Sequence, residues 1–108
     1  MTSGKDIIFV CSPYGGDIER NTEKAIEYCK WIIEERDSIP FAPHLYFPRL
    51  LDDNNLTERM AGIGFGMCLM SLCSAVWVFG DTMSNGMKRE IEYASKNGIP
   101  VMFVNRGD

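Results

Sequence analysis

The chain has 108 residues, of which 45% are hydrophobic, so it is large enough for one hydrophobic core and too short for two ordinary domains. Its formal net charge is -4, and its lysines and arginines are scattered instead of forming a basic stripe. This excludes the electrostatic pattern of a DNA- or RNA-binding protein. We therefore expect a single domain over residues 1–108 that does not bind polymeric nucleic acid.

The cysteines and apolar runs bear on the compartment in which the protein works. The four cysteines form no CxxC pair and no Cys/His cluster, so neither a disulfide framework nor a zinc site is predicted. We expect all of them to be reduced thiols of the core. They are Cys11, Cys29, Cys68 and Cys73. The apolar runs at residues 7–11 and 67–79 are too short or too interrupted for a membrane span, so the expected location is the cytosol, without a membrane partner.

In chain order, the first half alternates apolar runs with a helical pattern. Residues 7–11 form a short, continuous, mostly β-branched run, which is typical of a strand buried on both faces of a parallel sheet. A loop follows at residues 12–17, and apolar residues then recur at helical spacing, which predicts a helix from about Ile18 to Arg36. Residues 39–43 contain two prolines and therefore suit a strand at the edge of the sheet.

A second helix is predicted after a longer irregular stretch. Residues 45–55 include a proline and four consecutive Asp and Asn residues, which favour irregular structure. Thr57, with Glu58 beside it, is typical of a helix start, and the helix is expected to run to about Leu72. The glycines at every second position of residues 62–66 lie inside this helix and follow no strand. They indicate close helix packing and not a dinucleotide-binding fingerprint.

Two further strands flank a third helix. Residues 75–79 repeat the buried-strand pattern, residues 80–86 form a polar turn, and the helix that follows ends before Gly98. Residues 100–104 make the last strand. The order βαβαβαβ with short links predicts an α/β protein: a small three-layer, flavodoxin- or Rossmann-like open sheet of about four mostly parallel strands, with helices on both faces.

Three loops are predicted to meet beyond the carboxyl ends of the strands, where open parallel sheets bind their ligands. They are residues 12–17, 44–53 and 80–86. His44 ends its predicted strand and is therefore a candidate ligand contact. A single histidine after two prolines is also a common structural hydrogen-bonding residue, and this alternative stays open.

The first loop combines hydroxyl groups with two glycines. Ser12 and Tyr14 offer hydroxyls, and Gly15 with Gly16 lets backbone amides approach a phosphate or a sugar closely. The same glycines are equally well explained by a tight turn between a strand and a helix. The two interpretations have equal weight here.

The third loop leads into a predicted helix start. Ser84, Asn85 and Gly86 lie where backbone N–H groups have no partner within the helix, and such groups attract anions. Ser84 is also suited to be an ordinary N-cap. The two roles are compatible, because the hydroxyl and the amides point into the same space.

Glu90 is the carboxylate of the third helix that is aimed toward the sheet. At 100° per residue it lies about 60° from the axis of the apolar residues of this helix. Those residues are Met87, Ile91 and Ala94. Burying an unpaired carboxylate is costly, so it indicates a partner or a catalytic task. A boundary glutamate paired with an arginine or a tyrosine hydroxyl is the alternative.

Three blocks of the sequence resemble the nucleoside 2-deoxyribosyltransferase superfamily, close to its short bacterial and phage members. They are residues 8–16, 42–46 and 77–94, so the resemblance covers nearly the full length. The last block, which includes Ser84-Asn85-Gly86-Met87 and Glu90, is the most specific. The resemblance implies the same α/β fold.

The resemblance also implies an activity. In characterised relatives, the glutamate four residues after the glycine of this turn attacks the anomeric carbon of a deoxyribose and forms a glycosyl-enzyme intermediate. That position is Glu90, and Tyr14 falls where the transferases keep a tyrosine that orients the nucleophile. The implied protein is an N-glycosidase or deoxyribosyl transferase acting on a nucleotide or nucleoside. Neither a metal ion nor a cofactor is expected.

A substrate-binding set follows by the same resemblance. The branch acting on 2'-deoxynucleoside 5'-monophosphates has a phosphate-binding serine six residues before the nucleophile, here Ser84, so a monophosphate is a better guess than a free nucleoside. A second copy of the chain is the expected protein partner, because these families build dimers that complete each site. Together with the candidates from the three loops, the expected substrate-binding residues are Ser12, Gly15, Gly16, His44, Asp81, Ser84, Asn85, Gly86 and Met87.

The chain departs from this family at the acid that protonates or holds the base. Relatives place it on the helix before the third strand, whereas this sequence has no acidic residue between Arg59 and Gly80. The corresponding position lies near Gly66. General acid help is typically worth about a hundredfold or more, so activation of the leaving base needs another source. That source is His44, Asp53, Asp81 or a residue of another subunit.

Two alternatives to an enzyme follow from this departure. The missing acid favours a non-catalytic nucleotide-binding module, which would sense or sequester a nucleotide-derived signal. A structural oligomer with a vestigial pocket is the third hypothesis, favoured only if no nucleotide shifts its melting temperature. Fold class does not separate these functions, because similar sheets host unrelated activities.

Overall fold

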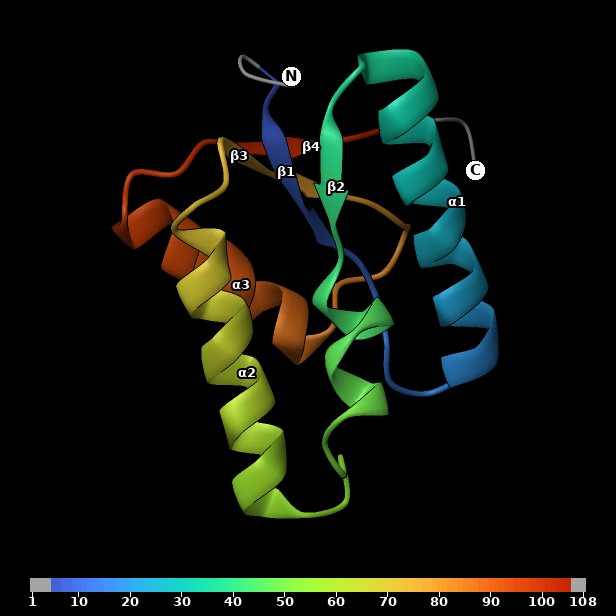
Figure 1. The fold of residues 1–108 in the computed structure, drawn as a ribbon, viewed down its shortest axis with the longest axis vertical. Helices are drawn as coiled ribbons and strands as arrows, with labels where there is room; N and C mark the ends of the chain where they lie inside the picture. The colour runs from blue at the N-terminus through green and yellow to red at the C-terminus, as the bar shows by residue number, and fades with distance from the viewer. Residues whose placement is uncertain (1–4, 106–108) are drawn as a thin grey trace.

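The computed structural model describes residues 5–105, which contain one parallel sheet of four strands (Figure 1). The central strand β1 (Ile7–Cys11) pairs with β2 (Ile39–Phe41) on one side and with β3 (Ala75–Val78) on the other. β3 pairs with β4 (Val101–Phe103), so the strand order is β2-β1-β3-β4. The predicted four-stranded, open parallel sheet is confirmed, and β2 lies at its edge as its prolines indicated.

Helices cover both faces of the sheet, as predicted. α1 (Ile18–Arg36) packs on one face, where Tyr28 and Ile32 join a buried cluster with residues of β1. α2 (Leu56–Met70) and α3 (Asn85–Lys96) pack on the other face, and they contribute Met70 and Met87 to a second cluster (Figure 1). The three layers therefore enclose two cores, one on each side of the sheet.

β1 supplies both cores because successive side chains of a strand point to opposite faces. Ile8 and Val10 face α1, whereas Phe9 and Cys11 face α2 and α3. All four side chains are buried. This two-sided burial explains why residues 7–11 read as a continuous apolar run with no polar alternation.

The second helix begins and ends slightly earlier than predicted. α2 starts at Leu56, because the side chain of Asn55 accepts a hydrogen bond from the backbone N–H of Glu58. Thr57 is therefore inside the first turn and is not the cap. The helix ends at Met70, and a turn leads from there into β3.

Residues 42–55, which we call the connecting segment, link β2 to α2. They contain two short 3₁₀ helices, Pro43–Leu45 and Phe47–Arg49. The strand predicted at residues 39–43 therefore ends earlier, at Phe41, because Pro43 begins the first of these turns. The segment and α2 together extend beyond the carboxyl ends of β1 and β2 (Figure 1). This extension creates the space in which the site described below is formed.

Glycines allow α2 to pack closely against the connecting segment. A Cβ at Gly62 would lie 3.3 Å from Cδ1 of Leu51, and a Cβ at Gly66 would lie 3.6 Å from Cβ of Pro43. Gly64 faces open space. The predicted role in close helix packing is thus confirmed at Gly62, whereas a Cβ at Gly66, one turn further on the same face, would make an ordinary contact.

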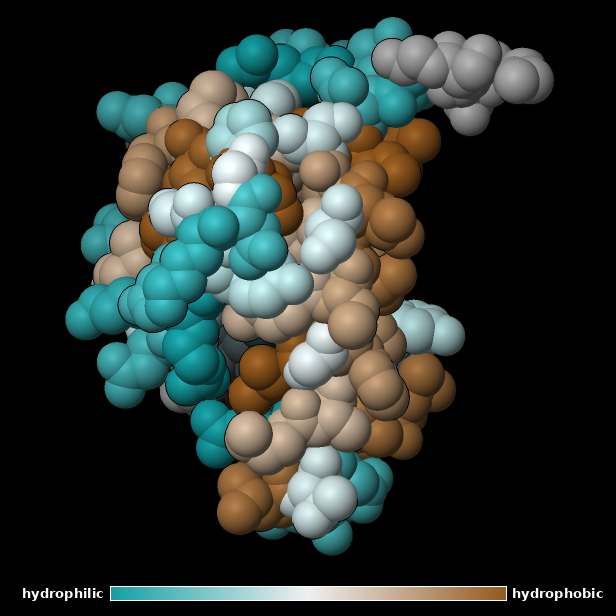
Figure 2. Space-filling view, turned by 90° about the vertical axis from the view of Figure 1, so that its left-hand side faces the viewer, coloured by the Kyte–Doolittle hydropathy of each residue, from teal (hydrophilic) through white to brown (hydrophobic). Residues whose placement is uncertain are grey.

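The outer surfaces of α2 and α3 differ in polarity. Figure 2 shows hydrophilic residues over α3 and apolar residues over α2 and the connecting segment. The exposed apolar side chains of α2 and the turn after it include Leu56, Met60, Phe65, Leu69 and Leu72. Within residues 5–105, no helix combines the length and the apolar content that crossing a membrane requires.

The four cysteines are unpaired, but the expectation that all lie in the core is wrong. Cys11 is buried, Cys29 and Cys73 are half-buried, and Cys68 is exposed. Cys68 lies one helical turn after Gly64, on the side of α2 that faces away from the protein interior. Burial in this helix follows its packing partners and not the hydropathy of its sequence.

Candidate active site

A cavity of about 550 Å³ lies where the loop after β1, the connecting segment, α2 and the start of α3 come together. This is the region beyond the carboxyl ends of the strands in which parallel sheets bind ligands. Most of the residues predicted to form the site line this cavity. They are Tyr14, Gly15, His44, Ser84, Asn85, Gly86, Met87 and Glu90.

The remaining predicted residues, Ser12, Gly16 and Asp81, are not among the lining residues. Ser12 is almost fully buried, and its hydroxyl has no hydrogen-bond partner among the described residues. Gly16 has a φ of 91°, which an L side chain rarely adopts, so the turn explains this glycine. Asp81 is exposed in the loop before α3.

The first loop is held by the helix that follows it. The side-chain amide of Asn21 donates hydrogen bonds to the carbonyl oxygens of Tyr14 and Gly15, each at 3.0 Å. Asp17 caps α1 by accepting from the N–H of Arg20. These bonds present Tyr14 and Gly15 to the cavity in a defined arrangement.

Ser84 and the first residues of α3, as far as Glu90, form one wall of the cavity, which we call the α3 wall. The hydroxyl oxygen of Ser84 accepts a hydrogen bond from the N–H of Met87 at 3.2 Å, so Ser84 is the N-cap. The amides of Asn85 and Gly86 precede the first bonds within the helix and carry its positive end. This end of the cavity therefore favours an anion.

Glu90 lies on the α3 wall as a half-buried carboxyl group. Its Oε1 is shielded from solvent and has no hydrogen-bond partner among the described residues. Burial raises the pKa of Glu90 to about 7, against the opposing effects of the neighbouring Cys11 thiol and the charge of Arg89. The ion pairs within residues 5–105 are Lys5–Asp37 and Lys96–Glu92, so the predicted alternative of a pairing with an arginine is not observed.

Cys11 packs beneath Glu90 at the end of β1. Its thiol lies 3.8 Å from the carbonyl oxygen of Met87, to which it donates, and contacts the Glu90 carboxyl group. Burial, followed by the charge of Glu90, raises the pKa of the Cys11 thiol, which stays neutral. The sequence analysis predicted Cys11 only as a core residue, although its place at the carboxyl end of β1 indicated that it lies near the site.

The rings of Tyr14 and His44 stack, with centroids 4.8 Å apart and planes 18° from parallel. Burial lowers the pKa of His44, opposed by a hydrogen bond to the backbone of Ser12 and by the charge of Asp53. Burial, then Asp53, raises the pKa of Tyr14. Both rings are thus neutral near pH 7. Tyr14, which was expected to orient Glu90, has no hydrogen bond with it among those described.

Gly66, which stands at the position of the missing acid, packs against the connecting segment. It lines the cavity, and its nearest side-chain neighbour is Pro43. Of the predicted substitutes, His44 and Asp53 line the cavity and Asp81 does not. No group of three or more His, Cys, Asp or Glu side chains in residues 5–105 is arranged to hold a metal ion.

Three charged lining residues were missed by sequence reasoning. Glu58 lines the cavity, but its carboxylate accepts the N–H of Asp52 and thereby holds the start of α2. Arg59 and Arg89 also line it, on α2 and α3. Their exposed positions on helices gave no sequence signal, because only the packing of α2 beside α3 brings them to one cavity.

Comparison with solved structures relates the fold to an enzyme class. The chain is similar to a 2-deoxyribosyltransferase from the psychrotolerant bacterium Bacillus psychrosaccharolyticus, described as a biocatalyst for the synthesis of antiviral and antitumoral nucleosides. The TM-score is 0.71, with 14% sequence identity, and the match covers 90% of this chain and 70% of that one. The nucleoside 2-deoxyribosyltransferase-like fold expected from the sequence is confirmed.

Comparison with curated proteins finds no match. A family match covers most of the chain: residues 6–104 match the family described as "Domain of unknown function (DUF7768)". The chain therefore belongs to the DUF7768 family.

Proposed function

We propose that this protein is an N-glycosidase or deoxyribosyl transferase that acts on a nucleotide or nucleoside, with Glu90 as the nucleophile. The observation that carries the proposal is the shielded, unpartnered carboxyl oxygen of Glu90, in a cavity that is also lined by the start of α3. An unsatisfied buried carboxyl group is costly, so it is typical of a site where a ligand completes it. The fold shared with a 2-deoxyribosyltransferase supports the reaction class.

In the proposed reaction, the ionised carboxylate of Glu90 attacks the anomeric carbon of the sugar. The bond between that carbon and the base nitrogen breaks, and the base leaves with the bonding electrons and takes up a proton. Water, or a second base, then attacks the same carbon and releases Glu90. The outcome is hydrolysis in the first case and base exchange in the second.

We propose that the proton for the leaving base comes from the connecting segment, where His44 donates it only after protonation, because its imidazole is neutral near pH 7. His44 and Asp53 both belong to this segment, both line the cavity, and the charge of Asp53 acts on His44. Asp81 lies outside the lining and is the weaker candidate. The stacked Tyr14 and His44 rings provide an aromatic surface beside the reacting group, suited to holding a base.

The experiment is a search for released base. Wild-type protein is incubated with ribo- and deoxyribonucleosides and their 5'-monophosphates, and each mixture is separated by chromatography. Glu90→Gln keeps the size of the side chain and should lower base release by about a thousandfold or more, with binding retained in a thermal-shift assay. Glu92→Gln, on the same helix and paired with Lys96, is the matched control and should behave as wild type. Equal release by wild type and Glu90→Gln contradicts the proposal.

A non-catalytic nucleotide-binding module is the second candidate. It is favoured by the absence of an acid on α2, where Gly66 packs against Pro43 instead. The same experiment separates the two functions. A large thermal stabilisation with the ligand recovered intact supports the binding module.

We further propose that two copies of the chain associate through the outer face of α2. That face carries Phe65 and Leu69 as exposed apolar side chains, and Gly64 leaves open space for a close approach. Phe65→Glu should reduce the sedimentation coefficient to that of a monomer. Ile33→Glu, at a similarly exposed position on α1, is the control and should leave it unchanged.

A further inference from the structure

A second, smaller cavity of about 300 Å³ adjoins the first. It is lined by residues of α2 and by one residue of α3. They are Leu56, Arg59, Met60, Ile63 and Arg89. Arg59, Ile63 and Arg89 line both cavities, so these side chains stand at the boundary between the two spaces.

The two charged side chains at this boundary, Arg59 and Arg89, are both positive. Neither Arg59 nor Arg89 belongs to an ion pair among residues 5–105, and the other lining residues of the second cavity are apolar. The carboxyl groups of Asp53, Glu58 and Glu90 line only the main cavity, where the charge of Arg89 acts on Glu90. In a chain with a net charge of -4, two unpaired guanidinium groups at one boundary indicate an anionic ligand.

Arg89 links this boundary to the start of α3. A Cβ at Gly86 would lie 3.8 Å from Nη2 of Arg89, so the guanidinium group lies close to the first turn of the helix. An anion there meets both the helix N-terminus and Arg89. Arg59 reaches the same boundary from α2 and is available to a second anion.

We infer that the second cavity binds a second phosphate, so that the ligand is a nucleoside 5'-diphosphate whose first phosphate meets Arg89 and whose second phosphate meets Arg59. The inference rests on the proposed function, because it places the nucleoside in the main cavity. Guanidinium groups form paired, charge-assisted hydrogen bonds with phosphate oxygens, and two linked phosphates match two such groups. A monophosphate leaves Arg59 without a partner.

The test is a comparison of affinities by calorimetry at one ionic strength. A nucleoside, its 5'-monophosphate and its 5'-diphosphate are titrated for each of four bases, and every mixture is checked for released base. For the preferred base, the diphosphate should bind about tenfold or more tightly than the monophosphate. Arg59→Gln should reduce this ratio to less than about twofold, and Arg59→Lys, which keeps the charge, should retain part of it.

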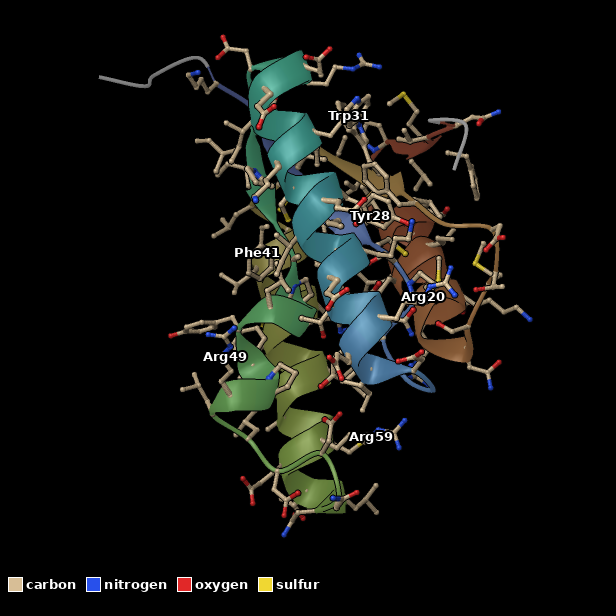
Figure 3. All side chains as sticks on the ribbon, turned by 90° about the vertical axis from the view of Figure 1, so that its right-hand side faces the viewer. Arg20, Tyr28, Trp31, Phe41, Arg49 and Arg59 are labelled. Atoms are coloured by element: carbon tan, nitrogen blue, oxygen red, sulfur yellow. The ribbon has the colours of Figure 1, made fainter. Side chains whose placement is uncertain are left out.

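Arg49→Gln is the matched control. Figure 3 shows Arg49 on the connecting segment at the opposite side of the molecule from Arg59, and Arg49 lines neither cavity. It should keep the wild-type ratio. Equal affinity for mono- and diphosphates of every base, or an unchanged ratio in Arg59→Gln, overturns the inference.

The inference and the proposed function fail separately. Base release from a monophosphate without a preference for diphosphates leaves the glycosidase in place and removes the second phosphate site. Tight, Arg59-dependent diphosphate binding without release of base supports the site and removes the glycosidase. Absence of binding by all of the compounds removes both.

Discussion

The two walls of the cavity differ in backbone structure, but in both of them burial favours the neutral form of an ionisable side chain. The α3 wall belongs to a helix anchored in the core by Met87 and Ala94, whereas the connecting segment has only two 3₁₀ turns. Each nevertheless holds a side chain whose neutral form is favoured, Glu90 on one wall and His44 on the other. Desolvation depends on what covers a group and not on the regularity of the backbone that carries it.

The two walls respond to pH in opposite directions. The pKa of Glu90 is raised from 4.5 to about 7, so ionising it weakens the fold as pH rises through this interval. The pKa of His44 is lowered from 6.5, so its contribution to stability is present above pH 6.5 and is lost as pH falls. Mutations can therefore separate the α3 wall from the connecting segment.

The largest expected effect concerns the anchoring of the α3 wall. Met87→Ala removes a side chain that is 1% exposed, and it should lower the free energy of unfolding by about 3 kcal/mol because it leaves a cavity in the core. Met60→Ala, on α2, removes a side chain that is 60% exposed and should change it by less than about 0.5 kcal/mol. Urea unfolding measures both. Equal losses would show that Met87 does not anchor the α3 wall in the core.

Glu90→Gln should stabilise the protein at pH 8 and have little effect at pH 4.5. The wild-type carboxyl group must ionise at a pKa raised from 4.5 to about 7. Removing that requirement should raise the free energy of unfolding at pH 8 by up to about 3 kcal/mol. Urea unfolding at the two pH values gives the difference, with Glu92→Gln as the exposed control. The same change at both pH values would contradict the burial of Glu90.

The pH dependence of base release should report the same group. A nucleophilic carboxylate must be ionised, so kcat/KM should fall about tenfold for each pH unit below the pKa of Glu90 near 7. Cys11→Ala, which removes the neighbouring thiol that lowers this pKa, should move the fall in kcat/KM to higher pH. A fall in kcat/KM that begins only near pH 4.5 would assign the nucleophile to an exposed carboxylate.

His44→Gln should give the smallest effect, with the opposite sign to that of Glu90→Gln. Wild type should lose stability as pH falls below 6.5, because the protonated imidazole is disfavoured in the folded state, and the variant should lose less. Thermal unfolding between pH 5 and 8, compared with wild type, measures this. A variant whose stability falls as steeply as that of wild type would show that His44 does not control the connecting segment.

Local patterns were enough to predict most of the fold. The run at residues 7–11 predicted a buried central strand, and helical spacing predicted α1 with its observed bounds, Ile18–Arg36. Ser84 was identified as an N-cap and Glu90 as the inward carboxylate of its helix. These features were predictable because strand alternation, helical periodicity and capping involve residues only a few positions apart.

By itself, the sequence thus determined the order of the elements, the face on which Glu90 lies and the anion-attracting start of α3. Only the tertiary structure decided that Tyr14 stacks on His44, that Gly62 and Gly66 face the connecting segment, and that Arg59 and Arg89 line the same two cavities. The physical reason is separation along the chain. These contacts join segments about thirty or more residues apart or depend on irregular turns, where no periodicity links the partners.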